Sequence, residues 1–167
     1  MKKSRIRFIT DQAIIAGVYV ALTLIFSQFS YLGVQFRLGE MLVLLPFFRK
    51  DYSFGLVLGC AIANIFSPLG YIDVIFGTLA TLVSVVAVSF SKRLWVATIY
   101  PVVFNAIIIG LELYFVLHLP FWLSAGQVAL GQFVVISLIG YAVFMNLRNN
   151  KRFLEVIRAN QNVTISY

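Results

Sequence analysis

The chain has 167 residues, of which 61% are hydrophobic and only 11% are charged, and its mean hydropathy is +0.95. A soluble domain of this size does not carry so much apolar sequence, because too little polar surface would remain to face water. The net charge of +7 does not indicate a nucleic-acid partner, since the basic residues are spread over several short segments rather than gathered on one face. These properties predict an integral membrane protein.

Six apolar segments follow one another along the chain, the first with Asp11 as its expected helix cap. A spanning helix needs about 20 apolar residues, so six spans leave no room for a soluble catalytic or nucleotide-binding domain. The second segment is short for a crossing, and we expect it to be tilted, partly re-entrant or extended by the outer loop. Each segment must be helical, because its backbone groups have no other partners in lipid. The sequence predicts a single all-α membrane domain over 1–167, with spans at about 11–29, 37–48, 52–66, 73–90, 94–117 and 121–147 and a polar cytoplasmic tail over 148–167.

Lysine and arginine residues mark alternate breaks between these segments. Cytoplasmic loops of membrane proteins are enriched in both residues, so the alternation predicts that the two termini lie in the cytoplasm. Of the 13 basic residues only Arg37 lies near the predicted outer face, where the topology does not require a cation, and it is the first functional candidate. The other twelve are Lys2, Lys3, Arg5, Arg7, Arg49, Lys50, Lys92, Arg93, Arg148, Lys151, Arg152 and Arg158.

Several polar residues fall at membrane depth, where ionisable groups are costly and by default indicate function. The predicted topology places most of them toward the outer face, so we expect one polar pocket that opens outward. An aromatic ring at this face would stack on a planar ligand. The candidate ligand contacts are Arg37, Glu40, Asn64, Tyr71, Asp73, Asn105, Trp122 and Gln132. Glu112 also lies toward this face, where it either contacts the ligand or, as a carboxylate in the headgroup region, needs no partner; it is not among the candidate contacts.

Each candidate also has a purely structural explanation. Arg37 and Glu40 are three residues apart, so on a helix they share a face and can neutralise each other. Asp73 follows a turn-like segment and suits a helix N-cap. Asn64 and Asn105 can form hydrogen bonds between helices. The aromatic candidates lie where a membrane-interface belt is expected.

A stripe of small residues runs along the first span. Ala13, Gly17 and Ala21 recur every four residues and therefore share one helix face. Such stripes let another helix approach closely and commonly mark helix association in membranes. The stripe therefore predicts either a docking face for a partner protein or packing within the protein's own bundle.

Several motifs along nearly the whole chain resemble one transporter family. They are Val34-Gln35-Phe36-Arg37 leading to Glu40, Leu44-Leu45-Pro46-Phe47-Phe48, Gly55-Leu56 through Gly59-Cys60, Ala63-Asn64, Gly70 with Asp73–Leu82, and Pro101, Asn105 and Gly110. Together they resemble the substrate-binding component of an energy-coupling-factor vitamin transporter. Within that class the chain is most similar to the QueT-type family, which is assigned to precursors of the modified nucleoside queuosine.

The resemblance implies that this chain is one component of a multi-protein transporter in a bacterial cell membrane. This chain would bind a scarce metabolite at its outer face and dock through its first span onto a transmembrane coupling protein. Two ATPases would drive the coupling protein, so this chain is not expected to be an enzyme or to need a cofactor. Toppling of the whole component within the membrane would then present the ligand to the cytoplasm.

The implied ligand is a 7-deazaguanine, in either its nitrile or its aminomethyl form. A guanine-like edge offers adjacent N–H donors, which a carboxylate accepts, and a carbonyl oxygen that suits Arg or an amide N–H. Glu40 or Asp73 would accept from the donors. The carbonyl would be met by Arg37, Asn64, Asn105 or Gln132, and Trp122 or Tyr71 would stack on the bicycle.

Two positions depart from the family's expected pattern. Gly17 stands where the stripe is expected to carry an alanine, which keeps the contact small. Gln132 stands where we expect a glutamate. If that acid meets a cationic part of the ligand, its absence favours an uncharged ligand or places the role on Glu40 or Asp73.

Other functions stay open from the sequence. A stand-alone carrier would need charged relay groups reachable from both faces, whereas these polar residues cluster outward. A related substrate-binding component for a different vitamin shares the same fold-level features. One histidine, one cysteine and no paired His/Glu motif on a span give metal hydrolysis or thiol chemistry almost no support.

Overall fold

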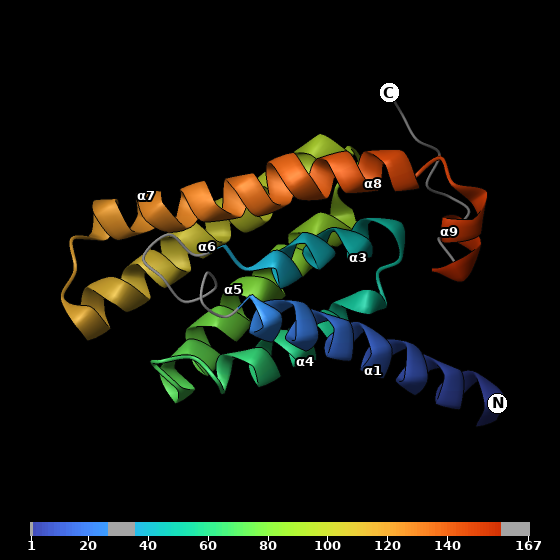
Figure 1. The fold of residues 1–167 in the computed structure, drawn as a ribbon, viewed down its shortest axis with the longest axis horizontal. Helices are drawn as coiled ribbons and strands as arrows, with labels where there is room; N and C mark the ends of the chain where they lie inside the picture. The colour runs from blue at the N-terminus through green and yellow to red at the C-terminus, as the bar shows by residue number, and fades with distance from the viewer. Residues whose placement is uncertain (1, 27–35, 158–167) are drawn as a thin grey trace.

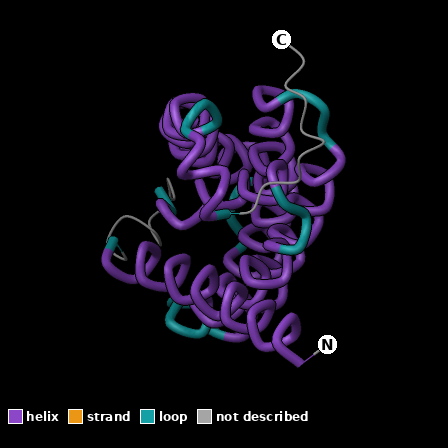
Figure 2. The backbone as a smooth tube through the Cα atoms, turned by 90° about the vertical axis from the view of Figure 1, so that its right-hand side faces the viewer, coloured by secondary structure: helices purple, strands orange, loops and turns teal. Residues whose placement is uncertain are grey.

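The structure is a computed structural model that describes residues 2–26 and 36–157. This part of the chain consists of helices and connecting turns without a strand (Figure 2), so the all-α fold class is confirmed. The end of the first predicted span at 27–29, the motif residues Val34 and Gln35, and the second half of the predicted tail lie outside the described residues. Four described segments are long and apolar enough to cross a membrane: Arg5–Ile25, Tyr71–Phe90, Leu94–Leu117 and Phe121–Leu147. Two shorter apolar helices, Leu38–Phe48 and Tyr52–Asn64, accompany them, and six crossings remain a prediction.

The observed elements follow the predicted segments closely except at the two ends. Helix α1 begins far earlier than residue 11, because the basic residues before it are good helix formers and nothing among them stops the helix. Asp11 is therefore not a cap, and its carboxylate instead pairs with Arg49 at 3.2 Å. Part of the predicted tail is a helix, α9. The elements are α1 (Lys2–Ile25), η1 (Leu38–Leu44), α3 (Leu45–Phe48), α4 (Tyr52–Asn64), α5 (Tyr71–Phe90), α6 (Leu94–Leu117), α7 (Phe121–Gln132), η2 (Phe133–Gly140), α8 (Tyr141–Leu147) and α9 (Lys151–Val156).

The short second segment lies in the middle of the bundle. Figure 1 shows α3 between α7–α8 on one side and α1 with α4 on the other. Its first part, η1, is a 3₁₀-helix of 7 residues, and α3 adds one α-helical turn of 4 residues. Because a 3₁₀-helix rises about 2.0 Å per residue against 1.5 Å in an α-helix, the segment reaches about 20 Å. It is shorter than a full crossing but carries its first residues deep among the other helices.

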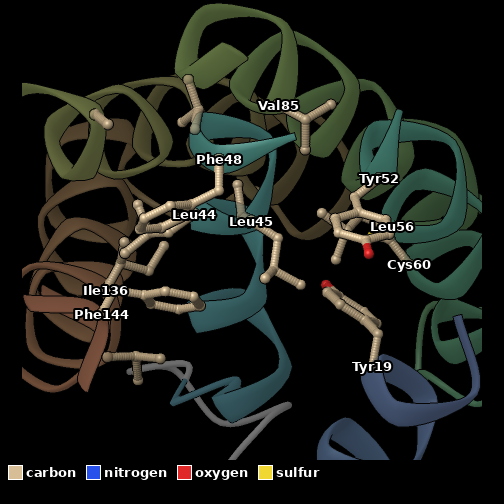
Figure 3. Packing of buried hydrophobic residues seen from close by; sticks show 14 of the residues in the cluster. Tyr19, Leu44, Leu45, Phe48, Tyr52, Leu56, Cys60, Val85, Ile136 and Phe144 are labelled. Atoms are coloured by element: carbon tan, nitrogen blue, oxygen red, sulfur yellow. The ribbon is translucent and has the colours of Figure 1, made fainter. Parts of the chain in front are cut away.

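The main apolar core forms around this central segment (Figure 3). Val43, Leu44 and Phe48 are at most 2% exposed. The Phe48 ring stacks on that of Phe144 with their centroids 5.7 Å apart, and Phe153 of α9 meets Phe48 edge-on at 6.1 Å. The tail therefore packs on the core rather than being only a polar extension. The other core residues include Tyr19, Leu45, Tyr52, Leu56, Cys60, Val85, Val88 and Ile136.

Several of the connecting segments that carry Lys and Arg lie together at one end of the bundle. Arg49 pairs with Asp11 of α1, and the Lys50 ammonium lies 4.1 Å from the ring centroid of Phe90, where α5 ends. Figure 1 shows the N-terminus and α9 together at the right, with the α6–α7 connection at the opposite end. This arrangement agrees with the alternation of basic breaks, while the orientation in a membrane remains a prediction.

Helices α1 and α4 approach closely through a glycine. A Cβ atom at Gly59 would lie 3.0 Å from both the Cα and the carbonyl oxygen of Ala16. We expect Gly59→Leu to lower the free energy of unfolding by at least about 1–3 kcal/mol, because backbone atoms cannot yield to the added side chain. Equilibrium unfolding in mixed micelles measures this change. Gly126→Leu is the matched control, since a Cβ at Gly126 meets nothing within 4 Å, and equal stability of the two variants would contradict the prediction.

Candidate functional site

Five charged or amide side chains from four elements are buried together, and we call them the polar cluster. Burying such groups is costly unless they find partners, so their burial calls for a specific reason. None is more than 4% exposed. The polar cluster consists of Arg37, which precedes η1, Glu40 of η1, Asn64 of α4, Asp73 of α5 and Glu112 of α6.

Asn64 joins three of these elements. Nη1 of Arg37 donates to Asn64 Oδ1 at 2.9 Å, and Nδ2 of Asn64 donates to the backbone carbonyl of Asp73 at 3.0 Å. A Cβ on Gly77 would lie 2.3 Å from Asn64 Nδ2, so only glycine leaves room for this amide. Asn64 therefore forms a hydrogen bond between helices, as its structural explanation predicts. The oxygen of the same amide accepts a hydrogen bond from Arg37 and so positions the guanidinium group.

Glu40 is held by α1. The Tyr19 hydroxyl donates to Glu40 Oε1 at 2.5 Å, whereas Oε2 has no hydrogen-bond partner among the described residues. The approach of the two elements is close, because a Cβ at Gly39 would lie 2.9 Å from the Tyr19 carbonyl oxygen. Glu40 and Arg37 interact electrostatically, but each also hydrogen-bonds to a different helix. Neutralisation of Glu40 by Arg37 therefore does not by itself explain why both residues are buried.

Asp73 lies inside the first turn of α5. The N-cap position belongs to Gly70, whose φ of 56° suits a residue without a side chain. The helix-cap alternative for Asp73 is therefore wrong. Its Oδ2 instead accepts a hydrogen bond from the hydroxyl of Ser67, a buried residue that the sequence did not single out.

Glu112 belongs to the polar cluster although it was not among the candidate contacts. It is fully buried, and it interacts electrostatically with Asp73 and Arg37. Neither of its oxygens receives a hydrogen bond of regular geometry from the described residues. One sequence signal was available: Thr98, Asn105 and Glu112 are spaced by seven residues, which places them on the same face of a helix, and all three are buried.

The remaining candidates divide into buried and exposed residues. Nδ2 of Asn105 donates to the Pro101 carbonyl at 2.9 Å within α6, and Asn105 is 4% exposed. Gln132 is 3% exposed, and its Oε1 has no hydrogen-bond partner in the described part of the chain. Tyr71 and Trp122 are 77% and 85% exposed. The structure does not bring these two rings to the polar cluster, and their exposure fits the interface-belt alternative.

The small-residue stripe faces away from the bundle. Ala13, Gly17 and Ala21 are exposed, and a Cβ at Gly17 would meet nothing within 4 Å. The inward face of α1 carries other residues, with Ala16 against Gly59 and Tyr19 against η1. Packing of the stripe within the protein's own bundle, one of its two explanations, is therefore wrong for the described residues.

The polar cluster brings hydrogen-bond acceptors and donors together in one buried place. It offers carboxylate oxygens without donors beside one guanidinium group, which suits a ligand with several N–H groups and an acceptor. Within residues 2–26 and 36–157, no group of three His, Cys, Asp or Glu side chains is placed to hold a metal ion.

Comparisons with known proteins identify the family of this chain. A family model described as "QueT transporter" matches residues 9–149. The curated "Queuosine precursor transporter QueT" of Lactococcus lactis subsp. cremoris (strain MG1363) is 39% identical over 149 residues, covering 80% of this chain and 88% of the relative. No solved structure matches. The extent of both matches shows that this chain, a membrane protein of apolar helices around a buried polar cluster, belongs to the QueT transporter family.

Proposed function

We propose that this chain is the substrate-binding subunit of an energy-coupling-factor importer and that it binds a 7-deazaguanine queuosine precursor in the polar cluster. The name of the Lactococcus relative supports the substrate class. The single observation that carries the site is the presence of buried acceptors without donors: Oε2 of Glu40 and both oxygens of Glu112. A bound ligand with N–H groups would supply the missing donors.

The guanine-like edge of such a ligand fits Glu40 and Arg37. Adjacent N–H donors of the ligand would meet Glu40, whose Oε1 is already fixed by Tyr19. The ligand carbonyl would accept from the Arg37 guanidinium, which Asn64 orients. A buried polar group left unpaired costs about 1–3 kcal/mol, so the site would reject purines whose donors and acceptors are arranged differently.

Energy for uptake would come from partner proteins. The exposed stripe of Ala13, Gly17 and Ala21 is the face we assign to docking on a transmembrane coupling protein, which partner ATPases would drive. Vesicles that contain only this protein are expected to bind the precursor without accumulating it. Accumulation in such vesicles would instead show a stand-alone carrier.

Glu40→Gln and Asp73→Asn test the site directly. Each substitution keeps the size of the side chain and removes a charged acceptor, so each is expected to weaken precursor binding by about tenfold or more. Titration calorimetry on the purified protein measures the affinity. Glu155→Gln, at an exposed position in α9, is the matched control and should bind as the wild type does. Unchanged affinity in both site variants would refute the carboxylate contacts.

A panel of candidate ligands tests the substrate class. A bound ligand raises the apparent thermal stability by mass action. We expect 7-deazaguanines to raise the unfolding temperature and guanine to raise it less. Stabilisation by a different vitamin, without any by the deazaguanines, would overturn the proposed substrate.

A further inference from the structure

We propose that Asp73 and Glu112 together receive an ammonium group, so that the aminomethyl form of the 7-deazaguanine is bound in preference to the nitrile form. This inference rests on the proposed function and specifies the substrate further. It assigns the two ends of the ligand to different carboxylates, with Glu40 on the guanine-like edge and the Asp73–Glu112 pair on the substituent at position 7.

The packing of α5 against α6 places the two carboxylates at the same level. The helices are joined by a connection of three residues and run antiparallel. Asp73 lies 17 residues before Phe90, where α5 ends, and Glu112 lies 18 residues after Leu94, where α6 begins. The adjoining apolar side chains confirm this register, because they form one cluster across the two helices that includes Phe76, Ala80, Ile109 and Leu113.

The two carboxylates lie close enough to interact, and Glu112 lacks a donor. Asp73 acts electrostatically on Glu112, although no hydrogen bond of regular geometry reaches either Glu112 oxygen from the described residues. Two neighbouring carboxylates in a buried site repel each other. A cation between them relieves this repulsion and supplies hydrogen-bond donors at the same time.

The charge of the polar cluster favours a cationic ligand. Three of its members are acidic, namely Glu40, Asp73 and Glu112. Arg37 is the only buried Lys or Arg in the part of the chain whose side chains are described, so the acidic residues of the cluster outnumber its basic one. The neutral Gln132, also buried, leaves this imbalance unchanged.

The two ligand forms differ in the group that meets the pair. An alkyl amine has a pKa near that of lysine, about 10.4, so the aminomethyl group is a cation with three donors at neutral pH. A nitrile is uncharged, has no donor, and presents a nitrogen lone pair. The pair attracts the ammonium group, whereas a nitrile would leave the oxygens of Glu112 without a donor.

The experiment compares three ligands on the wild-type protein by titration calorimetry. They are 7-aminomethyl-7-deazaguanine, the 7-cyano compound and the 7-hydroxymethyl compound, which is nearly the size of the first but uncharged. The aminomethyl ligand is expected to bind at least about tenfold more tightly than either neutral one, the size of one charge-assisted hydrogen bond. Glu112→Gln should remove most of this preference, measured as the ratio of the affinity for the aminomethyl ligand to that for each neutral one. Glu40→Gln should weaken all three.

The outcomes separate the inference from the function on which it rests. Equal binding of all three ligands by the wild-type protein would overturn the ammonium site and leave the proposed function standing. Failure of all three to bind would overturn both. Retention of the full preference in Glu112→Gln and also in Asp73→Asn would show that another group meets the ammonium, and would likewise overturn the assignment. If Glu112→Gln does not fold, the wild-type comparison together with Asp73→Asn still decides.

Discussion

Gly17→Leu is expected to abolish precursor uptake by cells while the isolated protein still binds its ligand. Gly17 lies in the middle of the exposed stripe, and a Cβ there meets no atom of the protein's own bundle within 4 Å. The substitution therefore leaves the fold intact. At a close helix–helix contact with a partner, by contrast, an added leucine side chain costs about 1–3 kcal/mol or more, and 1.4 kcal/mol is already tenfold in affinity.

Gly126→Leu provides the matched control for Gly17→Leu. Gly126 is also an exposed glycine of an apolar helix, and its added Cβ likewise meets nothing within 4 Å. We expect this variant to take up the precursor normally, as measured with a labelled ligand in cells that contain the complete transporter. Normal uptake by Gly17→Leu, or equal loss in both variants, would refute docking through the stripe.

The positions of the helices could be predicted because apolar length and basic breaks are local properties of the sequence. The ends of α5 and α6 lie within two residues of their predicted positions. The 3₁₀-helix of η1 and the π-helix of η2 could not be predicted in this way. Apolar length and basic breaks do not indicate a departure from 3.6 residues per turn. The two elements that show it contact each other, where Gly140 of η2 lies against Met41 and Leu44.

The candidate site was only partly predictable, because the sequence does not give the rotation of each helix. Arg37, Glu40, Asn64 and Asp73 were recognisable as costly polar groups at membrane depth, and the structure brings them together. Membrane depth does not tell whether a side chain faces lipid or a neighbouring helix. For the same reason the sequence groups the exposed rings of Tyr71 and Trp122 with the site and does not include the buried Glu112.

The largest effect on stability is expected for Arg37→Met. Arg37 interacts electrostatically with Asp73 and Glu40, acts on Glu112, and donates a hydrogen bond to Asn64. Removing one partner from a buried charge network leaves the remaining charges uncompensated and typically costs about 3–5 kcal/mol. We therefore expect the free energy of unfolding to fall by about that amount. Equilibrium unfolding in mixed micelles measures it, and Arg93→Met, at an exposed position between α5 and α6, should be nearly neutral.

A second substitution separates this loss of charge compensation from a loss of packing. Because Glu112 and Arg37 interact electrostatically, Glu112→Gln should recover part of the stability lost in Arg37→Met. The coupling free energy in the double-mutant cycle is expected to be about 0.5–3 kcal/mol, as for residues of one buried network. If the cost of Arg37→Met were a matter of lost side-chain volume, the two substitutions would simply add. An additive result would therefore show that Arg37 and Glu112 do not balance each other in the fold.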